Sequence, residues 1–192
     1  MGNINDKGFY NSDRIGKIGE ERYLEKLEEM KKGGKITDYM DLRKNPLCRL
    51  VDIDVAVMTG GKTFTVEDIE KMILAGPRKH NKNCCLIDVK TDTVILSTNN
   101  VFLEWIAHNV PGCFGSTHAD KWIYYGIDDR LQLKKVWSVD LKGLRSLITQ
   151  EEINFNNCNA NYCKKEGKEN FAYRIDIGWL IEKGVAKEMD LV

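Results

Sequence analysis

Acidic side chains within apolar runs are the residues of this chain best suited to chemistry. Asp52 and Asp54 lie in one such run, and Asp88 and Lys90 lie in a second. Read as buried β-strands, whose side chains alternate between faces, the runs place each pair on one face of its strand. An ionised carboxylate in such a strand is costly unless it is compensated, and a bound divalent cation is the usual compensation. The pattern therefore predicts a metal site.

A metal site of this kind suits the hydrolysis of phosphodiester bonds. That reaction needs a nucleophilic hydroxide, neutralisation of the phosphate charge and help for the leaving oxygen, and Mg²⁺ held by carboxylates supplies all three. Mg²⁺ keeps several waters, so two or three carboxylates and a main-chain carbonyl suffice. A neighbouring lysine can orient or deprotonate the attacking water and stabilise negative charge. Asp54, Asp88 and Lys90 meet this need, with the Val89 carbonyl as a further ligand.

These residues resemble the motif of the PD-(D/E)xK nuclease superfamily, which has the restriction-endonuclease-like fold. The matching residues are Asp54 in an apolar strand, Ile-Asp-Val-Lys at 87–90 in the next strand, and an acidic residue on the preceding helix. That acidic residue is Glu20, with Glu21 as the alternative. Strand periodicity cannot choose between Asp52 and Asp54, and the resemblance favours Asp54.

The downstream sequence looks like a phage-type subgroup of the same superfamily. The resemblance rests there on the segments 99–104 and 117–122, and it covers about residues 13–180 in all. Three features depart from the superfamily pattern. Asp88 replaces the commoner glutamate, a helix is expected between the two motif strands, and the usual proline before the first aspartate is absent.

The resemblance implies a single α/β domain over residues 1–192, with a restriction-endonuclease-like core in which helices flank a central mixed β-sheet. It implies a Mg²⁺-dependent deoxyribonuclease, with Mn²⁺ as a substitute metal. The implied metal ligands are Glu20, Asp54, Asp88 and the Val89 carbonyl. Lys90 is the implied catalytic lysine and acts with the three carboxylates. DNA is the expected partner; RNA, structure selectivity and a homodimer are left open. The alternative is a non-catalytic module on the same fold that binds nucleic acid or mediates a phage–host interaction.

Neighbouring residues keep two interpretations each. Glu104 either binds the metal or orients Lys90, and Asp120 either touches the metal or positions the strand that follows it. His118 is as consistent with packing as with catalysis, so we assign it no catalytic role. The tryptophans in strand-like segments are expected in the core: Trp105, Trp122 and Trp137.

A long helix must carry Glu20 to the site. It is expected from about residue 13, after an Asn-Ser cap, to beyond residue 30, with Gly33-Gly34 as its stop. Gly16 and Gly19 are costly inside a helix, which indicates that a ligand or a crossing strand approaches closely there.

The other elements follow from hydrophobic periodicity and turn residues. Strands are expected at 50–57 and 85–90, with a helix between them that is capped by Thr65 and Asp68. The segments 121–126 and 131–139 predict a hairpin, and Asp140 predicts the cap of a helix to 148. The remaining predictions are a strand at 93–97 that extends the second motif strand or is separate, a strand or short helix at 101–107, an exposed loop at 154–170 and a last strand at 171–177.

The composition sets the class of protein. A chain of 192 residues with 42% hydrophobic and 30% charged residues suits one well-cored domain. Lysine plus arginine equals aspartate plus glutamate at 29 each, so only local basic clusters could argue for nucleic acid. The apolar runs are shorter than the ~20 residues of a membrane span, and the N-terminus lacks a signal-peptide core. We therefore expect no membrane partner and a cytoplasmic location.

The six cysteines lack the dense, regular spacing of a secreted disulfide framework, so reduced thiols are expected. Two pairs have a spacing that allows them to be halves of a zinc site, because structural zinc is held by four such ligands. These pairs are Cys158 with Cys163, and Cys113 with His118.

Overall fold

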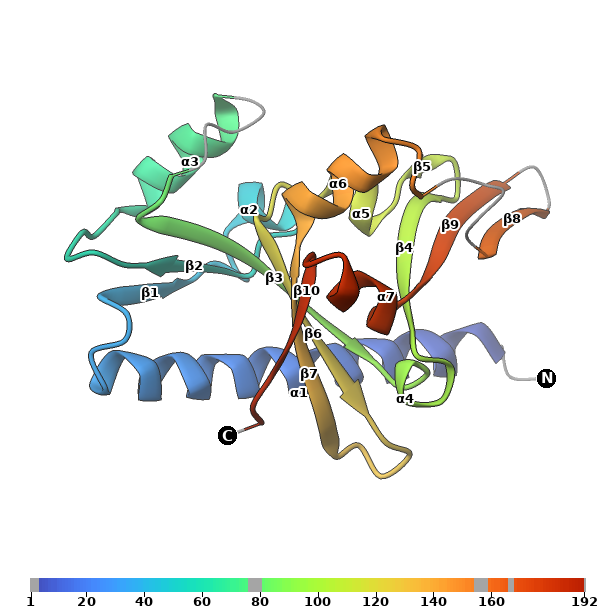
Figure 1. The fold of residues 1–192 in the computed structure, drawn as a ribbon, viewed down its shortest axis with the longest axis horizontal. Coiled ribbons are helices and arrows are strands. Elements are labelled where there is room, and N and C mark those ends of the chain that lie inside the picture. The colour runs from blue at the N-terminus through green and yellow to red at the C-terminus, as the bar shows by residue number, and fades with distance from the viewer. Residues whose placement is uncertain (1–3, 76–80, 154–158, 166–167, 192) are drawn as a thin grey trace.

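The computed structural model describes residues 4–75, 81–153, 159–165 and 168–191. Within them, two β-sheets and several helices form an α/β fold (Figure 1). The larger sheet has the order β1-β2-β3-β6-β7-β10. Its strands are β1 (Asp38–Asp41), β2 (Val55–Met58), β3 (Cys84–Asp92), β6 (Lys121–Ile127), β7 (Leu133–Asp140) and β10 (Ala186–Met189).

This larger sheet is mixed, as the sequence predicts. Its neighbouring strands pair antiparallel except β3 and β6, which pair parallel. Parallel neighbours need a long crossover connection. The crossover here carries α4 (Ile95–Thr98), β4 (Asn100–Ala107), β5 (Val110–Pro111) and α5 (Cys113–Ser116).

The smaller sheet is antiparallel and has the order β5-β4-β9-β8. It joins the crossover strands to a hairpin formed much later in the chain, β8 (Asn159–Lys165) and β9 (Lys168–Asp176). Because β4 belongs to the connection that leaves β3, this sheet begins close to the end of β3. It lies beside the larger sheet in Figure 1.

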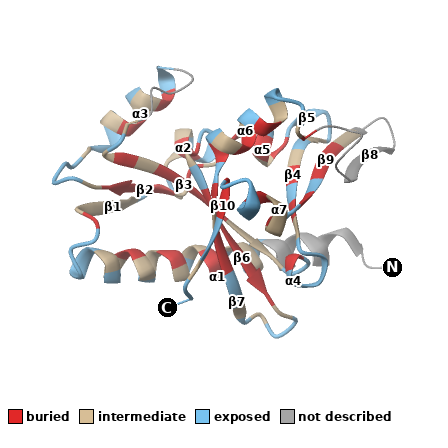
Figure 2. Cartoon of the chain, viewed as in Figure 1, coloured by how far each residue is buried: buried red, intermediate tan, exposed pale blue. Residues whose placement is uncertain are grey.

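Helix α1 (Ile4–Lys32) runs along one face of the larger sheet (Figure 1). Its Tyr23 and Leu27 pack with Val55, Ile87 and Val89 in one core cluster. The other face packs in a larger cluster that includes Leu86, Trp122 and Tyr124. Odd-numbered residues of β3 therefore face α1, and even-numbered residues face the opposite core. Figure 2 shows buried positions along the central strands.

The remaining helices are short. They are α2 (Pro46–Leu50), α3 (Val66–Leu74), α6 (Leu141–Thr149) and α7 (Ile177–Glu182). Buried residues of all four belong to the larger core cluster. In the described part of the chain, no helix has both the length and the apolar character needed to cross a membrane.

Several predicted elements are confirmed. Thr65 and Asp68 form a reciprocal capping box at α3, and Asp140 caps α6 by accepting a hydrogen bond from the Lys142 N–H. Strands β6 and β7 form the predicted hairpin, and the segment 101–107 lies in strand β4. Helix α1 ends at Lys32 as predicted, but it begins at Ile4, well before the predicted Asn-Ser cap.

The prediction of a strand at 50–57 is wrong in its first half. Pro46 lies at the start of α2 and Asn45 caps that helix, so residues 46–50 are helical. Asp52 has a left-handed backbone with φ of 47°, and β2 begins only at Val55. Asp52 and Asp54 therefore do not share a strand face.

Three further predictions are wrong. The segment 93–97 mostly forms α4 rather than a strand. The segment 154–170, predicted to be an exposed loop, contains all of β8 and the first residues of β9, while 154–158 and 166–167 lie outside the described residues. The strand at 171–177 is not the last one, because β10 follows it. In the polar segment 159–165, main-chain pairing with β9 forms the strand, and composition does not reveal such pairing.

Candidate active site

The site lies where β3 extends beyond its neighbour β2. The two strands pair from Met58 with Cys84 to Val55 with Ile87, and β3 then continues to Asp92. Among the described residues, this last part of β3 has β6 on one side and an open edge on the other. Open strand edges leave main-chain donors and acceptors available for side chains or ligands.

Asp54 covers the first part of this open edge. One of its carboxylate oxygens accepts a hydrogen bond from the Val89 N–H at 2.7 Å. The Val89 carbonyl leaves the same edge of β3, because the N–H and C=O of one strand residue point to the same side. Asp54 and the Val89 carbonyl are thus neighbours, as a shared metal site requires.

Asp88 lies beside them on the strand and is almost completely buried, with 2% of its surface exposed. One of its oxygens accepts a hydrogen bond from the Trp122 indole N–H at 2.8 Å and lies 2.8 Å from the Lys90 ammonium. The Lys90 ammonium also lies 5.9 Å from the centre of the Trp122 ring. The Lys90 side chain keeps 24% of its surface exposed, so it contacts both the buried carboxylate and solvent.

Burial makes both carboxylates hard to ionise. It raises the pKa of Asp88 to about 7, against the attraction of Lys90, and the charge of Asp54 raises it further. Burial likewise raises the pKa of Asp54, against the Val89 N–H, and the charge of Glu20 adds to the rise. A divalent cation bound between the two carboxylates would stabilise their ionised forms.

Lys90 behaves in the opposite way. Burial lowers its pKa, but the charge of Asp88, the hydrogen bond to it and the charges of other nearby groups together outweigh burial and hold the pKa above its ordinary value. The side chain is therefore an ammonium ion at neutral pH. Of the two predicted roles of Lys90, this state favours orienting water and stabilising charge over accepting a proton.

Gly19 brings helix α1 directly onto β3. A Cβ at this position would lie 2.1 Å from the Thr91 hydroxyl oxygen, which explains this glycine and confirms the prediction of a crossing strand here. At Gly16 the prediction of a close approach is not confirmed, because a Cβ there would meet only the Glu20 carboxylate, at 3.8 Å. The close approach at Gly19 brings Glu20 near enough to Asp54 to raise its pKa, whereas Glu21 is exposed. The structure therefore favours Glu20 over Glu21.

Glu20 forms an ion pair with Arg43 in this structure. Its carboxylate lies 3.0 Å from the Arg43 guanidinium, which also pairs with Asp41 at 2.7 Å. In the described part of the chain, no group of three or more His, Cys, Asp or Glu side chains is arranged to hold a metal ion. Asp54 and Asp88 remain as the carboxylate pair, with Glu20 nearby but bound to Arg43.

The donors still fit a hydrated Mg²⁺. This ion commonly binds through only one or two carboxylates and keeps several waters. Asp54, Asp88 and the Val89 carbonyl would hold it, and both carboxylates carry the raised pKa that binding would reverse. Glu20 stays a predicted ligand that would have to exchange Arg43 for the metal or for its waters.

Hydrogen bonds show what two of the neighbouring aspartates contact. Asp52 accepts a hydrogen bond from the Ser116 hydroxyl of α5, and its charge also acts on Asp88 and Lys90. Asp120 accepts a hydrogen bond from the Leu86 N–H at 2.7 Å, so it positions the paired strands β3 and β6. His118 is exposed. The two alternatives for Glu104, binding the metal or orienting Lys90, stay open.

Sequence reasoning missed two partners of the site. Trp122 was expected only in the core, where it is indeed fully buried, but it also donates to Asp88. Arg43 was not predicted as a partner of Glu20, because the two residues lie far apart in the sequence and meet only in the folded chain. Trp137 is buried as predicted, whereas Trp105 is 38% exposed.

The zinc prediction lies largely outside the described residues, since nothing is described of Cys158 or of the Cys163 side chain. The cysteines that the structure describes with their side chains form no disulfide bonds: Cys48, Cys84, Cys85 and Cys113. Cys113 lies near Lys90, and burial raises its thiol pKa to about 11.

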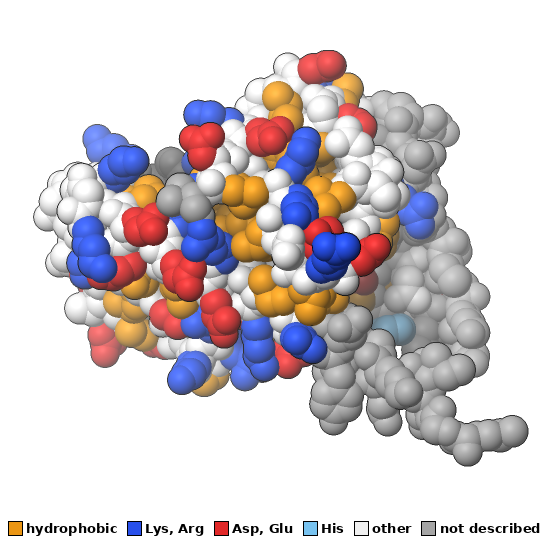
Figure 3. All heavy atoms as spheres, turned by 90° about the horizontal axis from the view of Figure 1, so that it is seen from below, with side chains coloured by type: hydrophobic (Ala, Val, Ile, Leu, Met, Phe, Trp, Pro, Cys, Tyr) orange, Lys and Arg blue, Asp and Glu red, His pale blue; other side chains and the backbone are white. Residues whose placement is uncertain are grey.

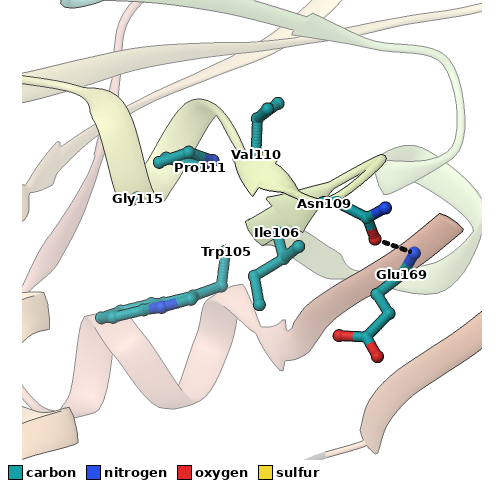
Figure 4. A pocket seen from close by; sticks show the side chains of 7 residues that line it. All are labelled: Trp105, Ile106, Asn109, Val110, Pro111, Gly115 and Glu169. Atoms are coloured by element: carbon teal, nitrogen blue, oxygen red, sulfur yellow. Dashed lines mark hydrogen bonds between the residues drawn. The ribbon is translucent and has the colours of Figure 1, made fainter.

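Two cavities lie in the described part of the chain, and one of them adjoins the site. One of about 550 Å³ is lined by Lys90, Thr91 and Asp92 of β3 together with residues of β4 and β9. The other, of about 620 Å³, lies beside Trp105 and is lined mainly by apolar side chains, together with Asn109 and Glu169 (Figure 4). Only the first contains a residue of the predicted catalytic set.

The surface charge is mixed. Figure 3 shows basic and acidic side chains interspersed over the face viewed from below, with apolar patches between them. This pattern agrees with the zero net charge of the chain. On this face, therefore, any attraction for nucleic acid would come from local basic groups.

Comparison of the chain with models of protein families, with curated proteins and with solved structures finds no match. The family resemblance therefore stays a hypothesis that rests on the motif residues. The fold itself is an α/β arrangement of a mixed six-stranded sheet, a small antiparallel sheet and helices.

Proposed function

We propose that this protein is a Mg²⁺-dependent nuclease that hydrolyses phosphodiester bonds in DNA, on a restriction-endonuclease-like core. One observation carries the proposal: Asp54 and Asp88, both with raised pKa, adjoin Lys90 at the open edge of β3. A structural ion pair alone would not need the second buried carboxylate, whose charge opposes the first. A divalent cation would stabilise both.

The chain's own residues divide the work of hydrolysis. Asp54 and Asp88, with the Val89 carbonyl, would hold a Mg²⁺ ion, which when bound supplies Lewis acidity at the phosphate and lowers the pKa of a water. The Lys90 ammonium has three N–H donors, so it can keep Asp88 and still donate to a phosphate oxygen. Trp122 fixes Asp88 from the buried side through its indole N–H. As the water oxygen attacks phosphorus, the water gives up a proton to solvent, the scissile P–O bond breaks and the leaving oxygen takes a proton from solvent.

A cleavage assay tests this proposal. Labelled linear, nicked, branched and single-stranded DNA, with matching RNA, would be incubated with Mg²⁺ or Mn²⁺. Wild type is expected to cut at least one substrate, and Lys90→Ala to lose roughly 10²-fold or more in rate, the usual cost of a lost charge-stabilising donor. Lys121→Ala is the matched control, because Lys121 is an exposed lysine on the neighbouring strand β6. Equal rates for wild type and Lys90→Ala would refute the assignment.

A non-catalytic nucleic-acid-binding module is the second candidate. Its support is that the charges of the site already pair among themselves, Lys90 with Asp88 and Arg43 with Glu20. A centre with such internal pairing can be stable without metal. Absence of Mn²⁺ binding at millimolar concentration, together with retained binding of oligonucleotides, would favour this module over the nuclease.

A further inference from the structure

The cavity of about 550 Å³ lies between the open edge of β3 and the smaller sheet. Lys90 and Asp92 contribute from β3, Phe102 from β4, Arg174 from β9 and Ile15 from α1. Its volume falls within the roughly 300–1,000 Å³ of typical small-molecule sites. The cavity thus adjoins the proposed catalytic lysine without belonging to the carboxylate site.

The wall formed by the smaller sheet is built from one cross-strand pair. Phe102 and Arg174 are directly opposite each other in the antiparallel pairing of β4 and β9, so their side chains share one face. The alternate residues Val101 and Leu103 are fully buried in the core, whereas Phe102 keeps 40% of its surface exposed. Arg174 is also exposed. An aromatic ring and a guanidinium group are therefore presented side by side to the cavity.

This combination matches the chemistry of a nucleotide. An exposed aromatic ring offers a stacking surface for any base, because every base has a π-face. Arg174 and Lys90 on two sides of the cavity complement the negative charge of a phosphodiester backbone. Inside a duplex a base is stacked on its neighbours, so a base that enters such a cavity must first leave the stack.

We propose that this cavity binds one unstacked nucleobase of the substrate, with Phe102 as its stacking surface and Arg174 beside the adjoining backbone. The protein would therefore act on strands that carry an unpaired nucleotide next to the cut. This inference rests on the proposed nuclease function, because it places the base beside Lys90. The base site specifies the class of substrate, which the carboxylates and the lysine alone do not.

Fluorescence of a single-stranded decamer with one 2-aminopurine tests the inference. Binding would be measured with Ca²⁺ in place of Mg²⁺, for wild type, Phe102→Leu and Val110→Ala. Phe102→Leu keeps an apolar side chain but removes the ring, and it is expected to bind roughly 5- to 100-fold more weakly and to lose the quenching of 2-aminopurine. Val110→Ala is the matched control, since Val110 is an exposed apolar residue of the same sheet, and it should behave as wild type.

Equal affinity and equal quenching for wild type and Phe102→Leu would overturn the inference. Should Phe102→Leu fail to fold, wild type is tested with a decamer in which an abasic site replaces the 2-aminopurine. Weaker binding of that decamer supports the base site, and unchanged binding overturns it. Asp54→Asn, assayed in parallel for cleavage with Mg²⁺, reports on the nuclease function alone, so failure of one proposal is distinguishable from failure of the other.

Discussion

The stability of the metal-free protein is expected to fall as the pH rises from about 5 to about 7. The perturbation is the ionisation of Asp88. Burial raises the pKa of this carboxyl from 3.8 to about 7. In the unfolded chain this carboxyl loses its proton near pH 4, whereas in the folded protein it keeps the proton until about pH 7. Between these values the folded state binds more protons than the unfolded state, so the free energy of unfolding decreases with increasing pH.

The size of this effect follows from the same two pKa values. One group with different pKa values in the two states changes stability by at most about 1.4 kcal/mol for each pH unit between them. From pKa 3.8 to about 7 the total is roughly 4 kcal/mol, lost by the time the pH passes about 7. Asp54, whose pKa is also raised, acts in the same direction.

Urea unfolding followed by tryptophan fluorescence measures this slope at several pH values in EDTA. Asp88→Asn is the comparison, because its amide oxygen can still accept from Trp122 but the group does not titrate. Wild type should lose about 1 kcal/mol or more per pH unit relative to Asp88→Asn between about pH 5 and pH 7. Mg²⁺ added above pH 7 should restore stability to wild type only. Identical slopes for the two proteins would refute the reasoning about Asp88.

Three further predictions concern the groups that support the site. Gly19→Ala should lower the free energy of unfolding by about 1–3 kcal/mol, because its Cβ would contact the Thr91 hydroxyl, and Thr91→Ala should rescue it in a double-mutant cycle. Trp122→Phe removes a donor to the Asp88 carboxylate, so the acidic limb of the pH–rate profile for cleavage should move to higher pH; an unchanged profile would contradict this role. Asp120→Ala leaves a main-chain N–H of β3 without its acceptor, and thermal unfolding should report a loss of about 1–3 kcal/mol, whereas Asp120→Asn should lose less.

Local signals in the sequence were enough to predict part of the fold. The Thr65 capping box, the cap at Asp140 and the glycines that end α1 depend on neighbouring residues, and each was predicted correctly. Gly19 was recognised as a point of close approach because glycine is costly inside a helix. The identity of its neighbour, Thr91, depended on how α1 crosses β3.

Features that depend on pairing between distant segments were not predictable in this way. The helix at 46–50, which begins at Pro46 after the Asn45 cap, was not predicted, and the predicted strand began too early as a result. The smaller sheet joins β4 to β9, which are far apart in the sequence. The hydrogen bond from Trp122 to Asp88 follows from the parallel register of β3 and β6, which a single sequence does not specify.

Whether Asp54 and Asp88 jointly bind a divalent cation is tested most directly by calorimetric titration with Mn²⁺. Wild type is expected to bind Mn²⁺, and Asp54→Asn should bind it at least roughly tenfold more weakly, while the Asn oxygen can still accept from the Val89 N–H. Asp129→Asn, which changes an exposed carboxylate in the β6–β7 turn, should bind as wild type. Equal Mn²⁺ affinity for wild type and Asp54→Asn, or no binding to wild type at millimolar Mn²⁺, would contradict the proposed metal centre.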